Sequence, residues 1–151
     1  MTSLHTSALD NLNHLVIIAN DGNLGYKEAA EYAESPLLKA SCLRYAEERS
    51  EFAGELRGYV KATGTAPETG SGPLAALHRV WIDIKTSFTA NNDAGLANDC
   101  VRGDEAAIAA YEDALTNATL TEDLKLVLER HLKLIKDALA DLQQQAQQLK
   151  K

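Results

Sequence analysis

The dipeptide Ser35-Pro36 constrains the fold of this chain strongly, because it separates two long segments of helical periodicity with no loop between them. The first pattern covers about 7–34 and the second about 36–63. Ser35 is suited to be an N-cap and Pro36 to be the first residue of the second helix. Helices joined this tightly must be antiparallel neighbours.

The rest of the chain carries three more helical patterns and no sustained alternation of the strand type. The patterns cover about 74–89, 94–115 and 120–148, and a Gly- and Pro-rich loop at 64–73 precedes them. Two short connections and one long crossover that carries a short extra helix are typical of the ferritin-like topology. We therefore expect a single all-α domain, an antiparallel ferritin-like four-helix bundle.

Polar residues that can cap a helix mark the expected helix starts. Two of them open a capping-box pattern, in which an acidic side chain follows three positions later. The expected N-caps, in chain order, are Ser7, Ser35, Asn92 or Asp93, and Thr119.

Charge and hydropathy exclude several classes of partner. The formal net charge is −7, and Lys150-Lys151 is the only basic cluster, so a nucleic-acid partner is not expected. The sequence has no apolar run of 18 residues, so we expect no membrane span. The N-terminal segment lacks a basic region and a small-residue cleavage site, which predicts a cytoplasmic protein.

Cys42 and Cys100 are too few for a disulfide framework. Each lies on the apolar stripe of an expected helix, which favours small buried thiols. A redox pair is the alternative.

The stretch Leu128 to Leu134, LERHLKL, invites comparison with a metal site of the ferritin-like kind. Di-iron bundles take a Glu from each of two helices and Glu-x-x-His from each of the other two. Here Glu129 and His131 are only two positions apart, so they point about 200° away from each other on a helix. His131 lies on the apolar stripe and is expected to face the core, and Glu129 is expected to point outward.

The other helices do not complete such a ligand set. The helix at 36–63 offers Glu48-x-x-Glu51, which has the right spacing without a histidine. The first helix has Ala19 and Asn23 where a carboxylate ligand is needed. A full six-ligand di-iron site is therefore not expected.

Polar residues nevertheless occupy inward positions on every long helix. They are Asn23, Tyr26, Arg49, Asp104, Tyr111 and His131. One interpretation is a buried polar layer, in which Arg49 pairs with Asp104 and the tyrosine hydroxyls complete the hydrogen bonds. A second is a diverged site for Fe, Mn or Zn; its candidate ligands are Glu28, Glu48, Asp104 and His131. The permanent charge of Arg49 argues against that site. A third is that His131 is exposed.

The crossover carries the only tryptophan, Trp81, with His78 one turn before it. We expect Trp81 to pack over one end of the bundle and His78 to form local hydrogen bonds.

Five motifs resemble, in the same order, those of a bacterial family of ferritin-like four-helix-bundle proteins that is defined by a domain of unknown function. They are ANDGNLGYKEAAE, YAEERSEFAGELRGYV, GPLAALHRVWIDIK, CVRGDEAAIAAYEDAL and LVLERHLKLI. The resemblance extends from about Ser7 to Ala140. It implies the fold and supplies no established reaction.

Two hypotheses of function follow. The first is a non-enzymatic structural, interaction or stress-associated protein without a cofactor, which forms a homo-oligomer and has an unidentified protein partner. The second is a diverged metal-binding protein that handles iron or resembles a di-metal oxidase. A ligand-binding bundle, lined by the alanines of the first and third long helices, is a further alternative.

Overall fold

A computed structural model describes the backbone of residues 2–62, 81–88, 92–116 and 120–150, with side chains for 12–61 and the three later ranges. Its long helices are α1 (Thr2–Tyr32), α2 (Pro36–Ala62), α4 (Asp93–Leu115) and α5 (Glu122–Leu149). Residues 81–87 are also helical. The predicted loop at 64–73, His78 and the start of the predicted 74–89 helix lie outside the described residues.

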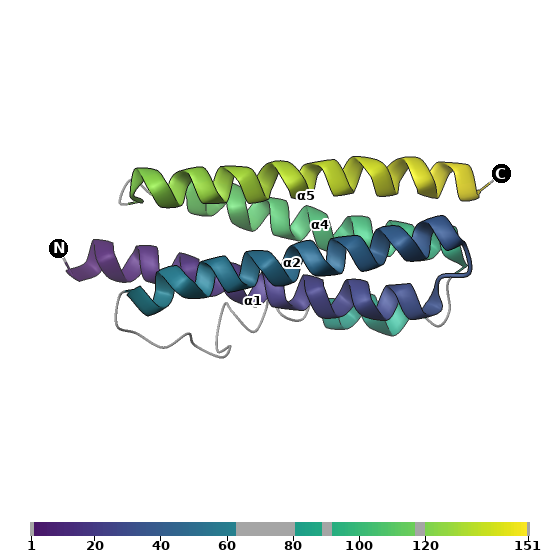
Figure 1. Cartoon of the computed structure of the whole chain (residues 1–151), viewed down its shortest axis with the longest axis horizontal. Coiled ribbons are helices and arrows are strands. Elements are labelled where there is room, and N and C mark those ends of the chain that lie inside the picture. The colour runs from purple at the N-terminus through teal and green to yellow at the C-terminus, as the bar shows by residue number, and fades with distance from the viewer. Residues whose placement is uncertain (1, 63–80, 89–91, 117–119, 151) are drawn as a thin grey trace.

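The four long helices form a bundle of two hairpins. α1 pairs with α2, and α4 pairs with α5 (Figure 1). The hairpins meet along α1–α4 and, less closely, along α2–α5. Neighbouring helices are antiparallel, and no strand occurs in the described ranges. The expected all-α four-helix bundle is confirmed. Within the described part of the chain, no helix has the length and apolar character needed to cross a membrane.

Two of the expected helix starts are wrong. α1 begins at Thr2, so Ser7 lies inside the helix; residues 2–6 contain no Pro or Gly that would stop it from extending. The last helix is capped by Thr121, whose side chain accepts a hydrogen bond from the Leu124 amide at 3.3 Å. The predicted cap, Thr119, lies two residues too early. A start at Glu122 places two acidic residues in the first turn, where the helix dipole favours them.

The α1–α2 turn is fixed by its own cap and by α4. Ser35 Oγ accepts a hydrogen bond from the Leu38 amide at 3.3 Å. The Asp93 carboxylate accepts from the Glu34 amide at 3.0 Å and from the Ser35 amide at 2.7 Å. Asn92 is the N-cap of α4, as its side chain accepts from the Gly95 amide at 2.9 Å. The start of α4 therefore holds the first hairpin in place.

The apolar core is divided into two clusters along the bundle. One cluster extends over Tyr26, Ala46, Val101 and Ala138, and the other over Ala19, Phe52, Ala107 and Ile135, among others. Buried polar residues lie at the boundary: Asn23, Arg49 and Asp104 each fall between the last member of one cluster and the first of the other. The bundle therefore has a polar layer across its middle.

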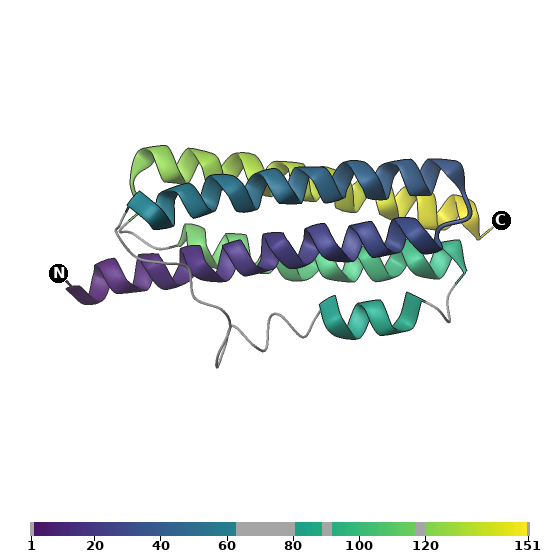
Figure 2. The ribbon, with the colours of Figure 1, turned by 60° about the horizontal axis from the view of Figure 1, so that its bottom comes forward.

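The short helical segment at 81–87 lies along the outside of α1 and α4 (Figure 2). Trp81 anchors it in a slot made by two glycines, since a Cβ on Gly25 or on Gly103 would come within 2.2 Å of the indole ring. The tryptophan therefore packs on the side of the bundle, and the expectation that it packs over one end is wrong. The slot requires a residue without a side chain on both α1 and α4.

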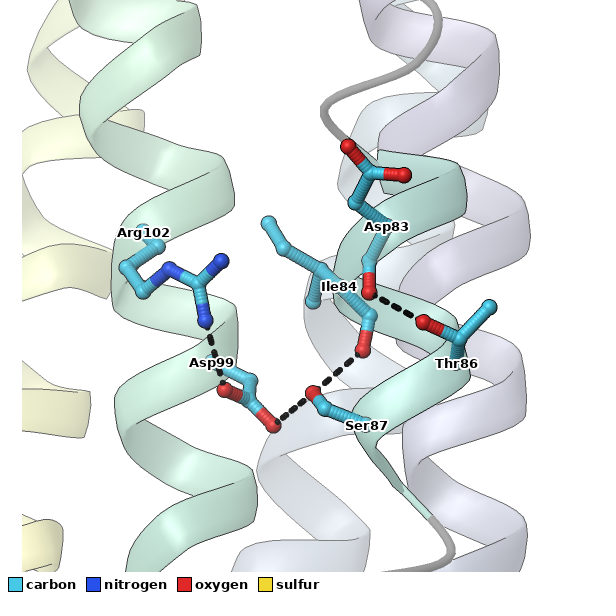
Figure 3. A network of polar contacts seen from close by, with 6 residues as sticks. All are labelled: Asp83, Ile84, Thr86, Ser87, Asp99 and Arg102. Atoms are coloured by element: carbon cyan, nitrogen blue, oxygen red, sulfur yellow. Dashed lines mark hydrogen bonds and ion pairs between the residues drawn. The ribbon is translucent and has the colours of Figure 1, made fainter.

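Polar contacts hold the far end of this segment to α4. The Ser87 hydroxyl lies 2.7 Å from the Asp99 carboxylate and 2.7 Å from the Ile84 carbonyl (Figure 3). Arg102 donates to the other oxygen of Asp99 at 3.1 Å. The crossover segment is thus attached to the bundle by both packing and hydrogen bonds.

Candidate functional site

The centre of the polar layer is an ion pair between two hairpins. Arg49 of α2 donates from Nη1 to Asp104 of α4 at 2.9 Å, and the two side chains are 2% and 0% exposed. Gly22 of α1 makes room for this reach: a Cβ there would lie 3.3 Å from Cγ of Arg49. The guanidinium carbon lies 5.2 Å from the centroid of the Tyr26 ring, within cation–π distance.

Asp104 accepts a second hydrogen bond, from the hydroxyl of Tyr26 at 2.6 Å. Burial raises the pKa of the Asp104 carboxyl, and the Arg49 guanidinium and both hydrogen bonds oppose that rise. Burial alone would lower the pKa of Arg49, but the Asp104 carboxylate raises it above its usual value. The 2.9 Å contact thus lets Arg49 and Asp104 compensate each other's charge within the core.

His131 lies in a second cluster of polar side chains, further along the bundle than Arg49, Asp104 and Tyr26. Its Nδ1 is 2.9 Å from the Tyr111 hydroxyl, and its Nε2 is 3.0 Å from Glu55 Oε1. The ring stacks on Phe52, with centroids 4.0 Å apart and planes 18° from parallel. An ionised Glu55 can only accept, so Nε2 carries the proton and Nδ1 accepts from the hydroxyl of Tyr111. Both ring nitrogens therefore have partners.

Glu55 connects this cluster to solvent. Its side chain is 37% exposed, whereas that of His131 is 0% exposed. Arg130 donates to its other carboxylate oxygen. The hydrogen bond from Arg130 is the main cause of a lowered pKa at Glu55. Burial lowers the pKa of His131, although Glu55 opposes that shift. The imidazole is therefore neutral at pH 7.

Glu55 and Arg130 belong to the His131 cluster, although the sequence did not lead us to expect them there. Glu55 belongs to an acidic run on α2 that resembles an ordinary solvated face, and only the register of α2 against α5 places it beside His131. One signal was available: Glu55 lies three residues from the buried Phe52, on the flank of the apolar stripe. Glu129 is exposed, as expected.

All six residues expected at inward positions are buried, but they do not form one set of contacts. Arg49, Asp104 and Tyr26 form the first cluster, and Tyr111 and His131 belong to the second. Asn23 instead donates to the Ala46 carbonyl at 2.7 Å. His131 does not lie across from Arg49 and Asp104, as a single polar layer would require. It lies further along because it pairs with Tyr111, two turns beyond Asp104 on α4.

The four candidate metal ligands do not converge. Glu28 pairs with Lys85 at 3.6 Å and Glu48 with Arg44 at 3.6 Å, each on the outer part of its helix. The other two candidates, Asp104 and His131, belong to the two separate clusters. No group of three or more His, Cys, Asp or Glu side chains in the described ranges could hold a metal ion. These residues do not fit a metal centre of the ferritin-like kind, and Arg49 already supplies the positive charge at the middle of the bundle.

The two cysteines are both buried free thiols. They come from diagonally opposed helices, α2 and α4, and their side chains meet in the core. A hydrogen bond with Cys42, together with burial, raises the pKa of the Cys100 thiol. A buried thiol with a raised pKa is a poor nucleophile, so Cys100 contributes to packing in the folded state and not to chemistry.

A cleft of about 270 Å³ lies at the end of the bundle where α1 ends and α4 begins. Its lining includes Tyr32, Asp93 and Leu149. It is therefore not the alanine-lined core cavity that a ligand-binding bundle would need.

Residues 7–117 match a protein family described as a domain of unknown function, DUF2383. The chain belongs to this family. The match spans all but the first residues of α1 together with α2 and α4, whereas α5 follows it. A comparison with curated proteins returned no match.

The DUF2383 chain is also similar to a solved structure, the bacterioferritin-related dodecameric thioferritin of Bacteroides fragilis. The TM-score is 0.76 at 16% sequence identity, over 95% of this chain and 86% of that one. At this identity the likeness establishes the ferritin-like fold alone, because unrelated sites occur on the same fold.

Proposed function

We propose that this DUF2383 protein is a non-enzymatic ferritin-like bundle that assembles with copies of itself and takes part in structural interactions. The observation that carries the proposal is the buried Arg49–Asp104 pair in the bundle core, the region in which four-helix bundles build their metal sites. Arg49 is permanently charged, so a divalent cation beside it would meet strong repulsion in the low-dielectric core. The interior of the bundle then holds the helices together, and contacts with other chains are made by the surface.

Assembly is supported by large apolar side chains on the surface. Leu37 and Leu43 of α2 are 62% and 52% exposed, and Leu126 of α5 is 63% exposed. Interfaces between identical chains are more apolar than the rest of a protein surface. The similar thioferritin is a dodecamer, so a bundle of this fold can pack with many copies of itself.

A cytoplasmic location is part of the proposal. Cys42 and Cys100 are in contact and both are free thiols, which a reducing compartment preserves.

The experiment is elemental analysis of the protein, purified without a His-tag, for Fe, Mn and Zn, together with light scattering for its mass in solution. We expect no stoichiometric metal and a mass several times that of one chain. Asp104→Ala and His131→Ala serve as matched variants, checked for helical content by circular dichroism. Stoichiometric metal in the wild type that is lost in both variants would overturn the non-metal part, and a monomer would overturn the assembly part.

The second candidate is an iron-handling protein with a diverged ligand set, and the likeness to a bacterioferritin-related protein is what favours it. It needs ligands other than the four candidates considered above, for example from a partner chain in an assembly. Iron bound by the assembled protein and unaffected by Asp104→Ala or His131→Ala would favour this second candidate.

A further inference from the structure

Arg49 uses only one of its three nitrogen atoms within the described structure. Nη1 donates to Asp104, whereas Nε and Nη2 are buried and have no acceptor among the described residues. These two nitrogens carry N–H groups along the same edge of the planar guanidinium, the edge that presents two parallel donors to one acceptor. Buried donors are almost always satisfied by protein or by ordered water. The free edge of Arg49 is therefore a pair of buried donors that calls for a hydrogen-bond acceptor in the core.

The charges around Arg49 favour a neutral acceptor for its Nε and Nη2 donors. Arg49 and Asp104 neutralise each other, and His131, which lies further along the bundle, is neutral. An additional anion would leave a net negative charge far from solvent, which is costly in a low-dielectric interior. A water molecule accepts two hydrogen bonds without adding charge. It also has two hydrogens to donate, and the core offers an oxygen to receive one of them.

That oxygen belongs to Tyr111. It lies seven residues after Asp104, on the same face of α4, and side chains on a helix tilt toward its N-terminus. This tilt favours a position of the Tyr111 hydroxyl between its own level on α4 and that of Asp104 and Arg49. It donates its hydrogen to His131 Nδ1, so its oxygen is available to accept. Arg49 and Tyr111 are close enough that each affects the pKa of the other.

We propose that an ordered water molecule accepts hydrogen bonds from Nε and Nη2 of Arg49 and donates one to the hydroxyl of Tyr111. This water joins the two polar clusters into one path across the bundle. From the surface, the path comprises Glu55, His131, Tyr111, the water, Arg49, Asp104 and Tyr26, and every link except those of the water is a contact between described residues. The water–Tyr111–His131–Glu55 part connects the centre of the core to solvent through groups that can pass a proton.

The test is a crystal structure at a resolution that shows ordered waters, from crystals grown in a bromide salt. We expect a water peak within hydrogen-bond distance of both Arg49 nitrogens and of the Tyr111 oxygen, without anomalous signal. An anomalous bromide peak at this edge would overturn the proposal, since the site would then bind anions. A guanidinium edge that contacts a backbone carbonyl would overturn it as well.

A second structure, of Tyr111→Phe, tests the link between the clusters. Loss of the hydroxyl removes one partner of the water while Arg49 and Asp104 remain. We expect the peak to vanish or to move away from the phenyl ring that replaces the phenol; a water unchanged in position would refute the path.

Melting temperatures provide a readout in solution that needs no crystal. Wild type and Arg49→Lys, which lacks the two-donor edge, are compared in formate and in chloride at equal ionic strength. We expect the difference between the two salts to be the same for both proteins. Stabilisation of the wild type alone by formate would show an oxyanion site and overturn the water.

Discussion

Arg49 and Asp104 form an ion pair that joins the α1–α2 hairpin to the α4–α5 hairpin inside the core, with their side chains 2% and 0% exposed. The pair lies at the boundary of the two apolar clusters, and Tyr26 completes it from a third helix. An arrangement of the hairpins that separated Arg49 from Asp104 would leave a buried charge without its partner. The contact therefore favours one arrangement of the four helices.

Removal of one partner of this pair should be costly. Arg49→Met is expected to lower the free energy of unfolding by about 3–5 kcal/mol, because Asp104 is left buried without compensation. Urea denaturation followed by circular dichroism measures this. The control is Arg44→Met, whose side chain is 70% exposed and whose ion pair is on the surface, with an expected change within about 0.5 kcal/mol. Equal losses in the two variants would contradict the account of Arg49.

Gly103→Ala should displace the crossover segment. The new Cβ would lie 2.2 Å from the Trp81 ring, and overpacking of this kind costs about 1–3 kcal/mol, which outweighs the better helix propensity of Ala. Trp81 is the single tryptophan, so its emission should shift to longer wavelength as the ring becomes exposed. Gly54→Ala is the matched control, since nothing lies within 4 Å of its Cβ position, and should stabilise α2 slightly. Unchanged emission in Gly103→Ala would show that the slot is not tight.

The free energy of unfolding should decrease as the pH is lowered, because of His131. Its pKa in the folded protein is lowered by burial, so below about pH 6.5 the unfolded chain binds a proton that the folded chain does not. The free energy of unfolding should therefore decrease as pH falls from about 6.5 toward the folded pKa, by up to about 1.4 kcal/mol per pH unit. Denaturant titrations of wild type and His131→Gln between about pH 8 and 5 measure this difference. The same pH dependence in both proteins would exclude His131 as its source.

The two thiols should be unreactive in the folded protein. Cys42 and Cys100 are fully buried, and the pKa of Cys100 is raised by its hydrogen bond with Cys42 and by burial. A thiol reagent should label neither at neutral pH without denaturant and both in denaturant, as counted by mass spectrometry. Rapid labelling of the native protein would show that the core opens there.

The helices and the inward positions follow from periodicity along one chain, and the contacts between helices do not. The stripe on the last helix places His131 inside and Glu129 outside, which the structure bears out. The partner of His131 depends on the register of α2 against α5, which no local pattern fixes, so the sequence does not distinguish Glu55 from a solvated surface charge. The packing position of Trp81 likewise depends on Gly25 and Gly103, which come together only in the folded bundle.

Helix ends were the least predictable feature at the local level. Thr119 and Thr121 are both suitable caps followed by acidic residues, and the local sequence does not show that the cap is Thr121. Ser35 and Asn92 were predictable because a Pro or a break in periodicity adjoins each of them.

We propose a bundle that assembles with copies of itself and has no metal centre. The most direct test is the native mass of the tag-free protein after incubation with excess ferrous iron and desalting. We expect a homo-oligomer whose mass is a whole multiple of the 16.3 kDa chain, with no iron retained in fixed ratio. A monomer, or an assembly that keeps a fixed number of iron atoms per chain, would contradict this expectation.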